Sequence, residues 1–236
     1  MSKLDFSLVL ACYNEGPTLT WSLEKVNEVL ENTKYKWEVI CINDASRDKT
    51  LEHLKKYSKK NKKFRVFNHE KNVGRGGTVS EGMQLARGRV VGYIDVDLEN
   101  SPVYIPEFIR EIDRGAADVV VGNRIEVGGM RRFFKYIAGN VYKLVVRFLL
   151  NVNLHDTEAG YKFFNREKIL PVLKKVEDKK WFFDTEICVR SVDAGLDVRE
   201  IPILCVMRPE KVSTINLIPD SIEFLRRIIA FRYNRY

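Results

Sequence analysis

Several features that define other protein classes are missing from this sequence. None of its apolar runs approaches the roughly 18 to 20 residues of a membrane-spanning helix. The start, MSKLDFSLVLACYNE, lacks the long apolar core of a signal peptide. No low-complexity linker, internal repeat or break in composition marks a second domain. We therefore expect a single cytoplasmic domain over residues 1–236.

Cysteine and histidine are scarce, with four and three residues. The cysteines stand singly in apolar runs, and none has the spacing of zinc ligands. They are Cys12, Cys41, Cys188 and Cys205. The pattern predicts buried free thiols rather than disulfides or a zinc site.

The net charge of +8 calls for an anionic partner. No helix-turn-helix, zinc-finger or RNA-stacking signature accompanies it, so we expect no nucleic acid. Anionic lipid and a phosphorylated substrate remain as the candidate partners. Residues 55–63 are a solvated helix end, but residues 131–147 and 226–235 interleave basic with apolar and aromatic residues.

The first half of the chain alternates β-branched apolar runs with segments of helical periodicity. The predicted strands are Phe6–Cys12, Trp37–Ile42, Phe64–Asn68, Val90–Asp95 and Asp118–Gly122. The predicted helices are Thr18–Asn32, Asp48–Lys60, Gly77–Ala86 and Ile105–Arg114. This alternation predicts an α/β fold with a mostly parallel central sheet and helices on both faces. Ligands in such folds bind where the carboxyl ends of the strands meet.

Two carboxylates follow the fourth predicted strand, at this edge of the sheet. Asp95 and Asp97 flank a single valine after the buried run VVGYI. Hard oxygen donors of this kind suit Mg²⁺ or Mn²⁺ bridging a diphosphate, because these ions keep part of their coordination shell for phosphate oxygens. The alternative is an Asp-rich turn that binds no ion.

The loops after the first two strands are also polar. Tyr13, Asn14 and Glu15 follow the first strand, and Asp44 ends the second, where it is suited to hydrogen-bonding a nucleoside. Asp48 is interpreted as the N-cap of the following helix.

A glycine-rich segment, NVGRGGTVSEG, opens the third predicted helix. It lacks the Gly-Lys-Ser/Thr of a Walker loop, and Val79 takes the place of the third glycine of a dinucleotide fingerprint. We expect its glycines to allow close backbone packing near a ligand, with Arg75 free to meet a phosphate or a base.

Taken in order, eight segments resemble the inverting family-2 glycosyltransferases of GT-A fold, which is Rossmann-like, and among them the dolichol-phosphate mannose and glucose synthases. The segments are ACYNE, INDASRDKT, NVGRGGTVSEGMQLARG, DVDL, VGNRIEVGG, DTEAGYKFF, WFFDTEI and RPEKVSTI. GRGGTV and DTEAGYKFF look closer to the glucosyl branch, without fixing the sugar.

The resemblance implies a set of site residues at matching positions. Tyr13, Glu15 and Asp44 would hold the nucleotide, with Ala11, Ile42 and Val96 beside them at the strand ends. Asp95, Asp97 and Glu99 would surround the metal, and Arg124 would meet the acceptor phosphate. Arg208 and Ser213 would handle the diphosphate, although Lys211 and Thr214 replace the late Gly and Lys of the family.

The implied reaction transfers mannose or glucose, with inversion, from GDP-mannose or UDP-glucose to a polyprenyl or dolichyl phosphate. A phosphomonoester has its second pKa near ~6 and is anionic at neutral pH, so it needs no strong base. Asp156 or Asp184 could serve as a base if the acceptor were a hydroxyl, although a structural role is preferred for Asp184. Two alternatives stay open: transfer to a sugar or polysaccharide hydroxyl, and a catalytically silent nucleotide-sugar-binding scaffold.

Residues 1–125 are expected to bind the nucleotide sugar, and residues 126–236 the acceptor and the membrane. The segment 131–150 reads as a basic amphipathic helix with an apolar stripe from Phe134 to Phe148, and the C-terminal segment is similar. We expect peripheral attachment to the cytoplasmic face of a membrane, made firm by a separate membrane subunit or by membrane helices of a longer chain. An ordinary helix that covers the sheet edge is the alternative.

Overall fold

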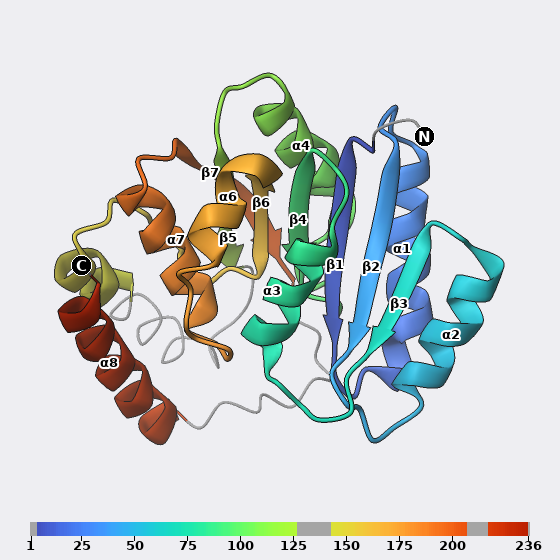
Figure 1. Ribbon diagram of the computed structural model, residues 1–236, viewed down its shortest axis with the longest axis horizontal. Helices are drawn as coiled ribbons and strands as arrows, with labels where there is room; N and C mark the ends of the chain where they lie inside the picture. Colours follow the sequence, from blue (N-terminus) through green and yellow to red (C-terminus); the bar gives the residue numbers. More distant parts are fainter. Residues whose placement is uncertain (1–3, 127–142, 207–216, 236) are drawn as a thin grey trace.

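The structure is a computed structural model that describes residues 4–126, 143–206 and 217–235 (Figure 1). Its described residues form a seven-stranded sheet with the order β3-β2-β1-β4-β6-β5-β7. The strands are β1 (Phe6–Cys12), β2 (Trp37–Asn43), β3 (Phe64–Asn68), β4 (Val90–Ile94), β5 (Val119–Glu126), β6 (Tyr161–Asn165) and β7 (Val198–Cys205). Only β6 is antiparallel to its neighbours, β4 and β5. The predicted fold class is confirmed.

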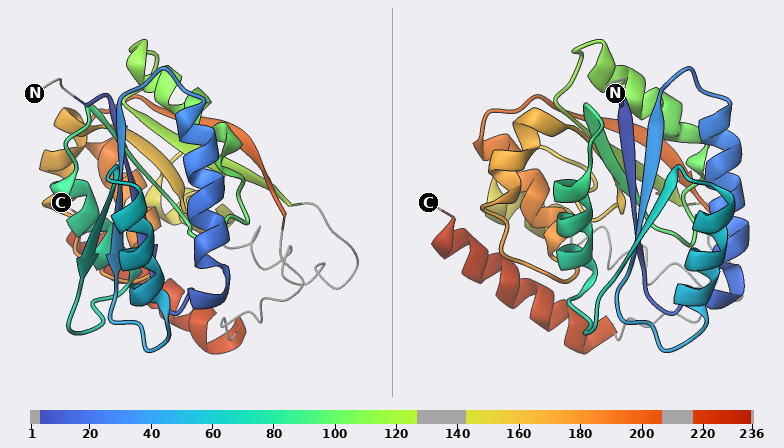
Figure 2. Two further views of the ribbon diagram at one scale, coloured as in Figure 1. Left: turned by 90° about the vertical axis from the view of Figure 1, so that its right-hand side faces the viewer. Right: turned by 45° about the vertical axis from the view of Figure 1, so that its right-hand side comes forward.

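Helices cover both faces of the sheet (Figure 2). One face packs against α1 (Gly16–Glu31), α2 (Thr50–Lys60) and α4 (Ile105–Asp113), which follows the short 3-10 helix η1 (Pro102–Tyr104). The other face packs against α3 (Arg75–Leu85), α6 (Arg166–Leu173) and α7 (Phe183–Asp193). The last helix of the chain is α8 (Leu217–Asn234).

The strands form where the sequence offers apolar side chains for both faces. Every residue of β2 is buried, as expected of a parallel strand covered on both sides. In β1, Leu8 and Leu10 enter the core under α1, whereas Val9 between them enters the core under α3. Burying each such side chain stabilises the fold by about 1.5–3 kcal/mol.

The elements predicted for the first half are present, with shifts of a few residues at their ends. The predicted fourth strand stops at Ile94, so Asp95 already belongs to the following loop. The predicted fifth strand continues to Glu126, which brings Arg124 into the sheet. The four cysteines are buried free thiols, as predicted. Strands β6 and β7 complete the same sheet as the strands of the first half.

A third layer lies outside α7. Residues 143–150 are helical, and their Val146 and Leu150 pack with Ile228 and Phe231 of α8. Arg235 fixes the end of α8 by donating to Asp193 and to the carbonyl of Leu150. The first part of the predicted 131–150 helix lies outside the described residues. No helix within the described ranges is long and apolar enough to cross a membrane.

Candidate active site at the carboxyl edge of the sheet

The predicted site residues that the structure describes belong mainly to loops at one edge of the sheet, where the parallel strands end, the lower edge in Figure 1. The loops after β1, β2 and β4 meet there because these strands are parallel and adjacent. Strand β6 runs in the opposite direction, so its beginning, not its end, lies at this edge. Segments from both halves of the sequence therefore face one another.

Asp48 joins the first two loops of the site. Its carboxylate accepts the backbone N–H of Gly16, at the start of α1, at 2.9 Å, and that of Thr50, at the start of α2, at 3.0 Å. Burial opposes ionisation, but these hydrogen bonds hold the pKa of Asp48 below its usual value. The N-cap of α2 is Lys49, so the predicted cap was one residue too early. Asp48 instead binds N–H groups at the starts of both helices. Tyr13, in the loop that Asp48 anchors, is 44% exposed.

Asp44 lies in the site, but its carboxylate is occupied by the chain itself. It accepts the N–H groups of Val73 and Gly74 at 2.8 and 3.0 Å, and His69 Nδ1 lies 2.8 Å away. A nucleoside contact from Asp44 would have to share these oxygens. Gly74 has a φ of +90°, a conformation that glycine adopts without strain.

Two of the residues assigned to the nucleotide by resemblance have side chains in the core. Ile42 is fully buried and its strand pairs with β1 and β3 on its two sides. Val96 is 4% exposed and packs in the cluster under α1. Ala11, by contrast, is only partly buried at the end of β1. The structure thus gives Ile42 a role in the core, and leaves Val96 only its backbone for a ligand.

Asp95 and Asp97 follow β4 as expected, and the Asp95 side chain is 36% exposed. Asp97 accepts the backbone N–H of Glu99 at 3.2 Å, and the carbonyl of Glu99 accepts the N–H of Val206. Within the described ranges, no three His, Cys, Asp or Glu side chains are arranged to hold a metal. The expected trio with Glu99 is therefore not preassembled. Two carboxylates that leave coordination positions for phosphate oxygens still fit Mg²⁺ or Mn²⁺.

We had expected Arg75 to be free to bind a phosphate or a base, but in the structure its guanidinium is bound to two carboxylates. Its Nε and Nη2 donate to Oδ1 of Asp95 at 2.9 and 2.7 Å, and its Nη1 donates to Asp184. Burial would lower the pKa of Arg75, but the two carboxylates outweigh it and raise the pKa, so the guanidinium stays charged. Burial raises the pKa of Asp95 against the effect of Arg75.

Asp184 and Lys162 extend this pairing into the core. The sequence had suggested Asp184 as a possible base, with a structural role preferred, whereas Lys162 was not predicted as part of the site. Lys162 is fully buried, with its Nζ 3.0 Å from Oδ1 of Asp184. The Tyr93 hydroxyl donates to the same oxygen at 2.7 Å. The sequence does contain a sign of this pair, since Lys162 in YKFF and Asp184 in WFFD are charged residues within apolar runs. A charge buried in this way needs a partner of opposite charge.

Gly160 makes the approach of Asp95 and Arg75 to β6 possible. A methyl group at this position would collide with Oδ2 of Asp95 and with Nη2 of Arg75. The carbonyl of Gly160 also accepts the backbone N–H of Asp95 at 3.0 Å. The Asp95 carboxylate therefore rests against the residue that precedes β6.

A second ionic group at this edge of the sheet is formed by Arg124, Asp156 and Lys143. Arg124 donates to the two oxygens of Asp156 at 2.7 and 3.0 Å, and Lys143 Nζ lies 3.3 Å from Oδ2. Glu200 of β7 fixes the turn by accepting the N–H of Asp156 at 2.9 Å. Burial of Asp156 opposes ionisation, but Arg124 and Lys143 lower the pKa of Asp156 to about 2. The sequence reading counted Lys143 only as part of a basic helix face.

Glu158 lies beside this group, and its pKa is shifted in the direction opposite to that of Asp156. Its carboxylate is 3.9 Å from Nη2 of Arg124, and the side chain is 28% exposed. Burial raises the pKa of Glu158 to about 7; Arg124 opposes the rise and Asp156 adds to it. Glu158 can therefore exchange a proton near neutral pH, whereas Asp156 stays ionised.

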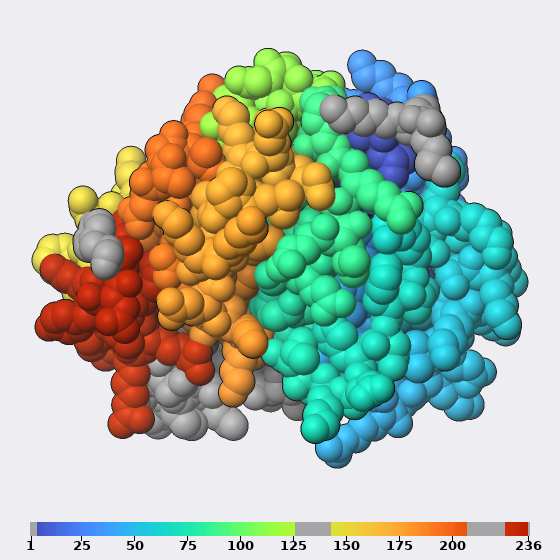
Figure 3. Space-filling model, in the orientation of Figure 1, coloured from blue at the N-terminus to red at the C-terminus, as the bar shows by residue number. Residues whose placement is uncertain are grey.

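The segment between α6 and α7 is pinned to the beginning of α3, against which it lies in the space-filling view (Figure 3). Gly77 donates its backbone N–H to the carbonyl of Lys179 at 3.0 Å. A side chain at Gly74 or Gly76 would strike the backbone of Lys179 or Lys180. The expected close packing of the glycine-rich segment is present, and its partner is this chain's own loop.

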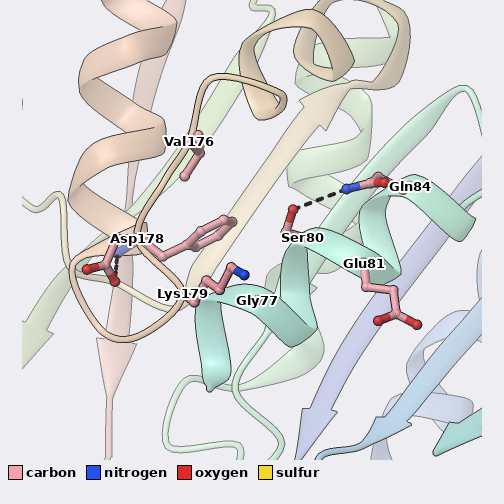
Figure 4. Close-up of a pocket in the computed structure, with 8 residues that line it drawn as sticks. Gly77, Ser80, Glu81, Gln84, Val176, Asp178 and Lys179 are labelled. Carbon is pink, nitrogen blue, oxygen red and sulfur yellow. Dashed lines mark hydrogen bonds between the residues drawn. The ribbon is translucent and has the colours of Figure 1, made fainter. Parts of the chain in front are cut away.

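A pocket of about 290 Å³ opens beside this contact, between α3 and the 176–179 segment (Figure 4). Ser80, Glu81, Asp178 and Lys179 line it. It contains none of the predicted site residues. The nucleotide-sugar site predicted from the sequence thus lies at the sheet edge, apart from this pocket. Arg208 and Ser213 lie outside the described residues.

Comparisons with known proteins identify the family of this chain. The model of the family "Glycosyl transferase family 2" matches residues 7–171. The chain therefore belongs to glycosyl transferase family 2, as the resemblance had indicated.

Its relatives include enzymes named for dolichyl phosphate. The yeast dolichyl-phosphate beta-glucosyltransferase is 25% identical over 98% of this chain and 75% of its own length. Glycosyltransferase AglD of Haloferax volcanii is 29% identical over 93% of this chain. The match spans only 35% of AglD.

Solved structures of the same fold carry a sugar nucleotide and a metal. Glucosyl-3-phosphoglycerate synthase of Mycobacterium tuberculosis, in complex with Mn²⁺, UDP-glucose and phosphoglyceric acid, has a TM-score of 0.71 at 17% identity. The match covers 98% of this chain and 79% of that chain. The same synthase has been solved with Mg²⁺ and UDP, with a TM-score of 0.72 at 15% identity over 97% of this chain and 79% of that one.

Proposed function

We propose that this chain transfers a hexose, with inversion, from a nucleotide sugar to a polyprenyl or dolichyl phosphate. The proposal rests on the ionic group of Arg124, Asp156 and Lys143, which we take as the acceptor side of the site. Two cations, Arg124 and Lys143, stand there around a carboxylate that cannot take up a proton near neutral pH.

A phosphate acceptor fits this arrangement because it brings its own negative charge. Asp156, the base expected for a hydroxyl acceptor, has a pKa of about 2 and accepts hydrogen bonds at both oxygens. A phosphomonoester, with its second pKa near ~6, needs no such base. In this proposal the guanidinium of Arg124 orients the acceptor phosphate for attack opposite the leaving diphosphate.

A hydroxyl acceptor is the second candidate, and Glu158 is the observation that favours it. Its pKa of about 7 is that of a serviceable general base. In the phosphate proposal the same group has another effect: once ionised, it repels the incoming dianion. Replacing Glu158 therefore separates the two candidates.

UDP-glucose is the donor that we test first. Support comes from the yeast relative, named as a glucosyltransferase, and from the synthase solved with UDP-glucose. In the proposal Tyr13 and Glu15 line the nucleotide site at the end of β1. GDP-mannose remains the second donor to be tested.

Asp95 and Asp97 are the residues proposed to hold Mg²⁺ or Mn²⁺, with Glu99 beside them. A bound ion would neutralise the charge that develops on the departing diphosphate. Arg75 keeps the Asp95 carboxylate in place through its two hydrogen bonds.

Peripheral membrane binding is proposed for the surface shared by residues 143–150 and α8. Leu144 and Phe148 are 68% and 83% exposed on one face of their helix. Leu225, Ile229 and Tyr233 are exposed at intervals of four residues along α8. Apolar side chains with basic neighbours suit the headgroup region, which a polyprenyl phosphate requires its enzyme to reach.

The test is product formation by the protein with polyprenyl phosphate in vesicles. Radiolabelled UDP-glucose and GDP-mannose are supplied separately, with Mg²⁺ or with excess chelator. We expect a metal-dependent, lipid-extractable labelled product from UDP-glucose. Label that appears only on an added sugar or polysaccharide would establish the hydroxyl acceptor instead.

A further inference from the structure

Arg75 holds a position at the metal carboxylate that the transfer reaction itself does not explain. Two of its nitrogens donate to the same oxygen of Asp95, and the third donates to Asp184. The rings of Tyr93 and Trp181 lie 5.7 and 5.6 Å from the guanidinium carbon. With only 14% of its side chain exposed, Arg75 is a buried member of this group.

The four side chains Asp95, Asp184, Arg75 and Lys162 balance one another electrically before any metal arrives, and Asp97 lies outside this balance. Asp95 and Asp184 carry one negative charge each, and Arg75 and Lys162 one positive charge each. Lys162 is fully buried and Asp184 is 2% exposed, so neither charge is screened well by water. Because an unpaired buried charge is costly, the balance holds Arg75 at Asp95.

The contact occupies an atom that a metal would also use. Oδ1 of Asp95 accepts both hydrogen bonds from Arg75, while Oδ2 rests against Gly160. A free divalent ion that approaches Asp95 therefore meets a fixed positive charge at hydrogen-bond distance from the same carboxylate. An ion that arrives with a diphosphate brings compensating negative charge.

We propose that Arg75 is the built-in counter-cation of Asp95 and makes metal binding conditional on the nucleotide diphosphate. It is a positioning residue whose charge weakens the binding of metal alone and has less effect on the metal–diphosphate pair. The inference deepens the metal-dependent transfer proposed above and rests on it. It replaces the expectation that Arg75 would be a free phosphate ligand.

The experiment measures Mn²⁺ binding by calorimetry with and without UDP, and contains no sugar donor or lipid. In Arg75→Gln, which removes the charge, Mn²⁺ alone is expected to bind about tenfold more tightly or better. By linkage, the gain in Mn²⁺ affinity on adding UDP shrinks correspondingly. Arg75→Lys keeps the charge and is expected to stay near the wild type. Arg65→Gln, which breaks an ion pair with Glu38 at 2.8 Å, is the matched control and is expected to leave Mn²⁺ binding unchanged.

For Asp184→Asn we expect the opposite change in the affinity for Mn²⁺ alone. The substitution removes one negative charge while Arg75 stays, so Mn²⁺ alone is expected to bind more weakly than in the wild type. Circular dichroism and thermal melting check that each variant is folded. If Arg75→Gln is unfolded, the Asp184→Asn and Arg75→Lys titrations decide. The inference is overturned if folded Arg75→Gln binds Mn²⁺ no more tightly than the wild type. It is also overturned if Arg75→Lys binds Mn²⁺ more tightly, or if Asp184→Asn does not bind Mn²⁺ more weakly. Because no acceptor is present, these results are independent of whether the lipid product forms.

Discussion

Asp156 and Glu158 are two carboxylates in one turn whose surroundings drive their pKa values in opposite directions. Arg124 and Lys143 hold Asp156 ionised, whereas Glu158, 3.9 Å from the nearest Arg124 nitrogen, is protonated up to about pH 7. Each shift gives a measurable dependence on pH, in stability for Asp156 and in activity for Glu158.

For Glu158, we expect the rate with a lipid phosphate to fall as the pH rises above about 7. The ionised carboxylate then faces the acceptor dianion. In Glu158→Gln the fall should disappear, and the rate should remain on the plateau reached after the phosphate ionises near ~6. The pH profile of kcat/KM for the two proteins is the measurement. Loss of nearly all activity in Glu158→Gln would contradict this prediction and indicate that the Glu158 carboxylate is needed for transfer.

For Asp156, we expect Asp156→Asn to destabilise the fold by about 3–5 kcal/mol, because it leaves Arg124 partly buried without its counter-ion. The pKa of Asp156 is lowered from 3.8 to about 2, so its stabilising effect is complete above pH 3.8 and is lost as the pH falls through 2. Denaturant unfolding from pH 2 to 7 should show this acid-dependent loss only in the wild type. The exposed pair Arg89–Asp113 offers the control, since Asp113→Asn should cost at most about 1 kcal/mol.

At the scale of elements, the start of the short strand β6 positions the carboxylate of Asp95, the proposed metal ligand. Gly160→Ala puts a methyl group where Asp95 and Arg75 meet the strand. A displacement of about 1 Å at a reacting group can cost on the order of 100-fold in rate, and we expect a loss of that size. Steady-state kinetics with UDP-glucose is the measurement.

Gly195→Ala is the control for Gly160→Ala, because Gly195 has no neighbour in the space that a Cβ would fill. Its φ of +72° makes alanine strained, so stability should fall while activity per folded molecule is kept. Equal losses of activity in both variants would mean that the Gly160 contact has no special role.

The same elements explain what the sequence could and could not predict. Strand-end residues such as Asp95 and Asp97 were found because periodicity locates the ends of parallel strands. Strand β6 was not predicted because it is only five residues long, YKFFN, and the alternation of strands and helices seen in the first half does not continue around it. The Arg75–Asp184 pair joins residues 109 positions apart, and no local pattern reports such a contact. Arg75 was therefore expected to be free, when its partners were simply distant in sequence.

At the scale of the whole molecule, the exposed apolar residues of α8 and residues 143–150 predict membrane contact. We expect the wild type to float with anionic vesicles at low salt and to be released at high salt. Phe148→Asp and Tyr233→Asp should each weaken flotation, because both side chains are more than 80% exposed and contribute little to the core. Trp21→Asp on α1, at the opposite end of the molecule in Figure 1, is the matched control. If all three variants float alike, the surface is not a membrane contact.

The antiparallel strand in the middle of the sheet also has a consequence for synthesis on the ribosome. Strand β5 pairs only with β6 and β7 in the described sheet, and both are made later. At about 5–20 residues per second, the ribosome needs roughly 2–8 s to pass from the end of β5 to the end of β6. During that time the run Val119–Val121 has no strand beside it, whereas β1 to β4 can already associate. A nascent chain is thus most prone to aggregate through β5, and a chaperone that binds apolar strands would act there.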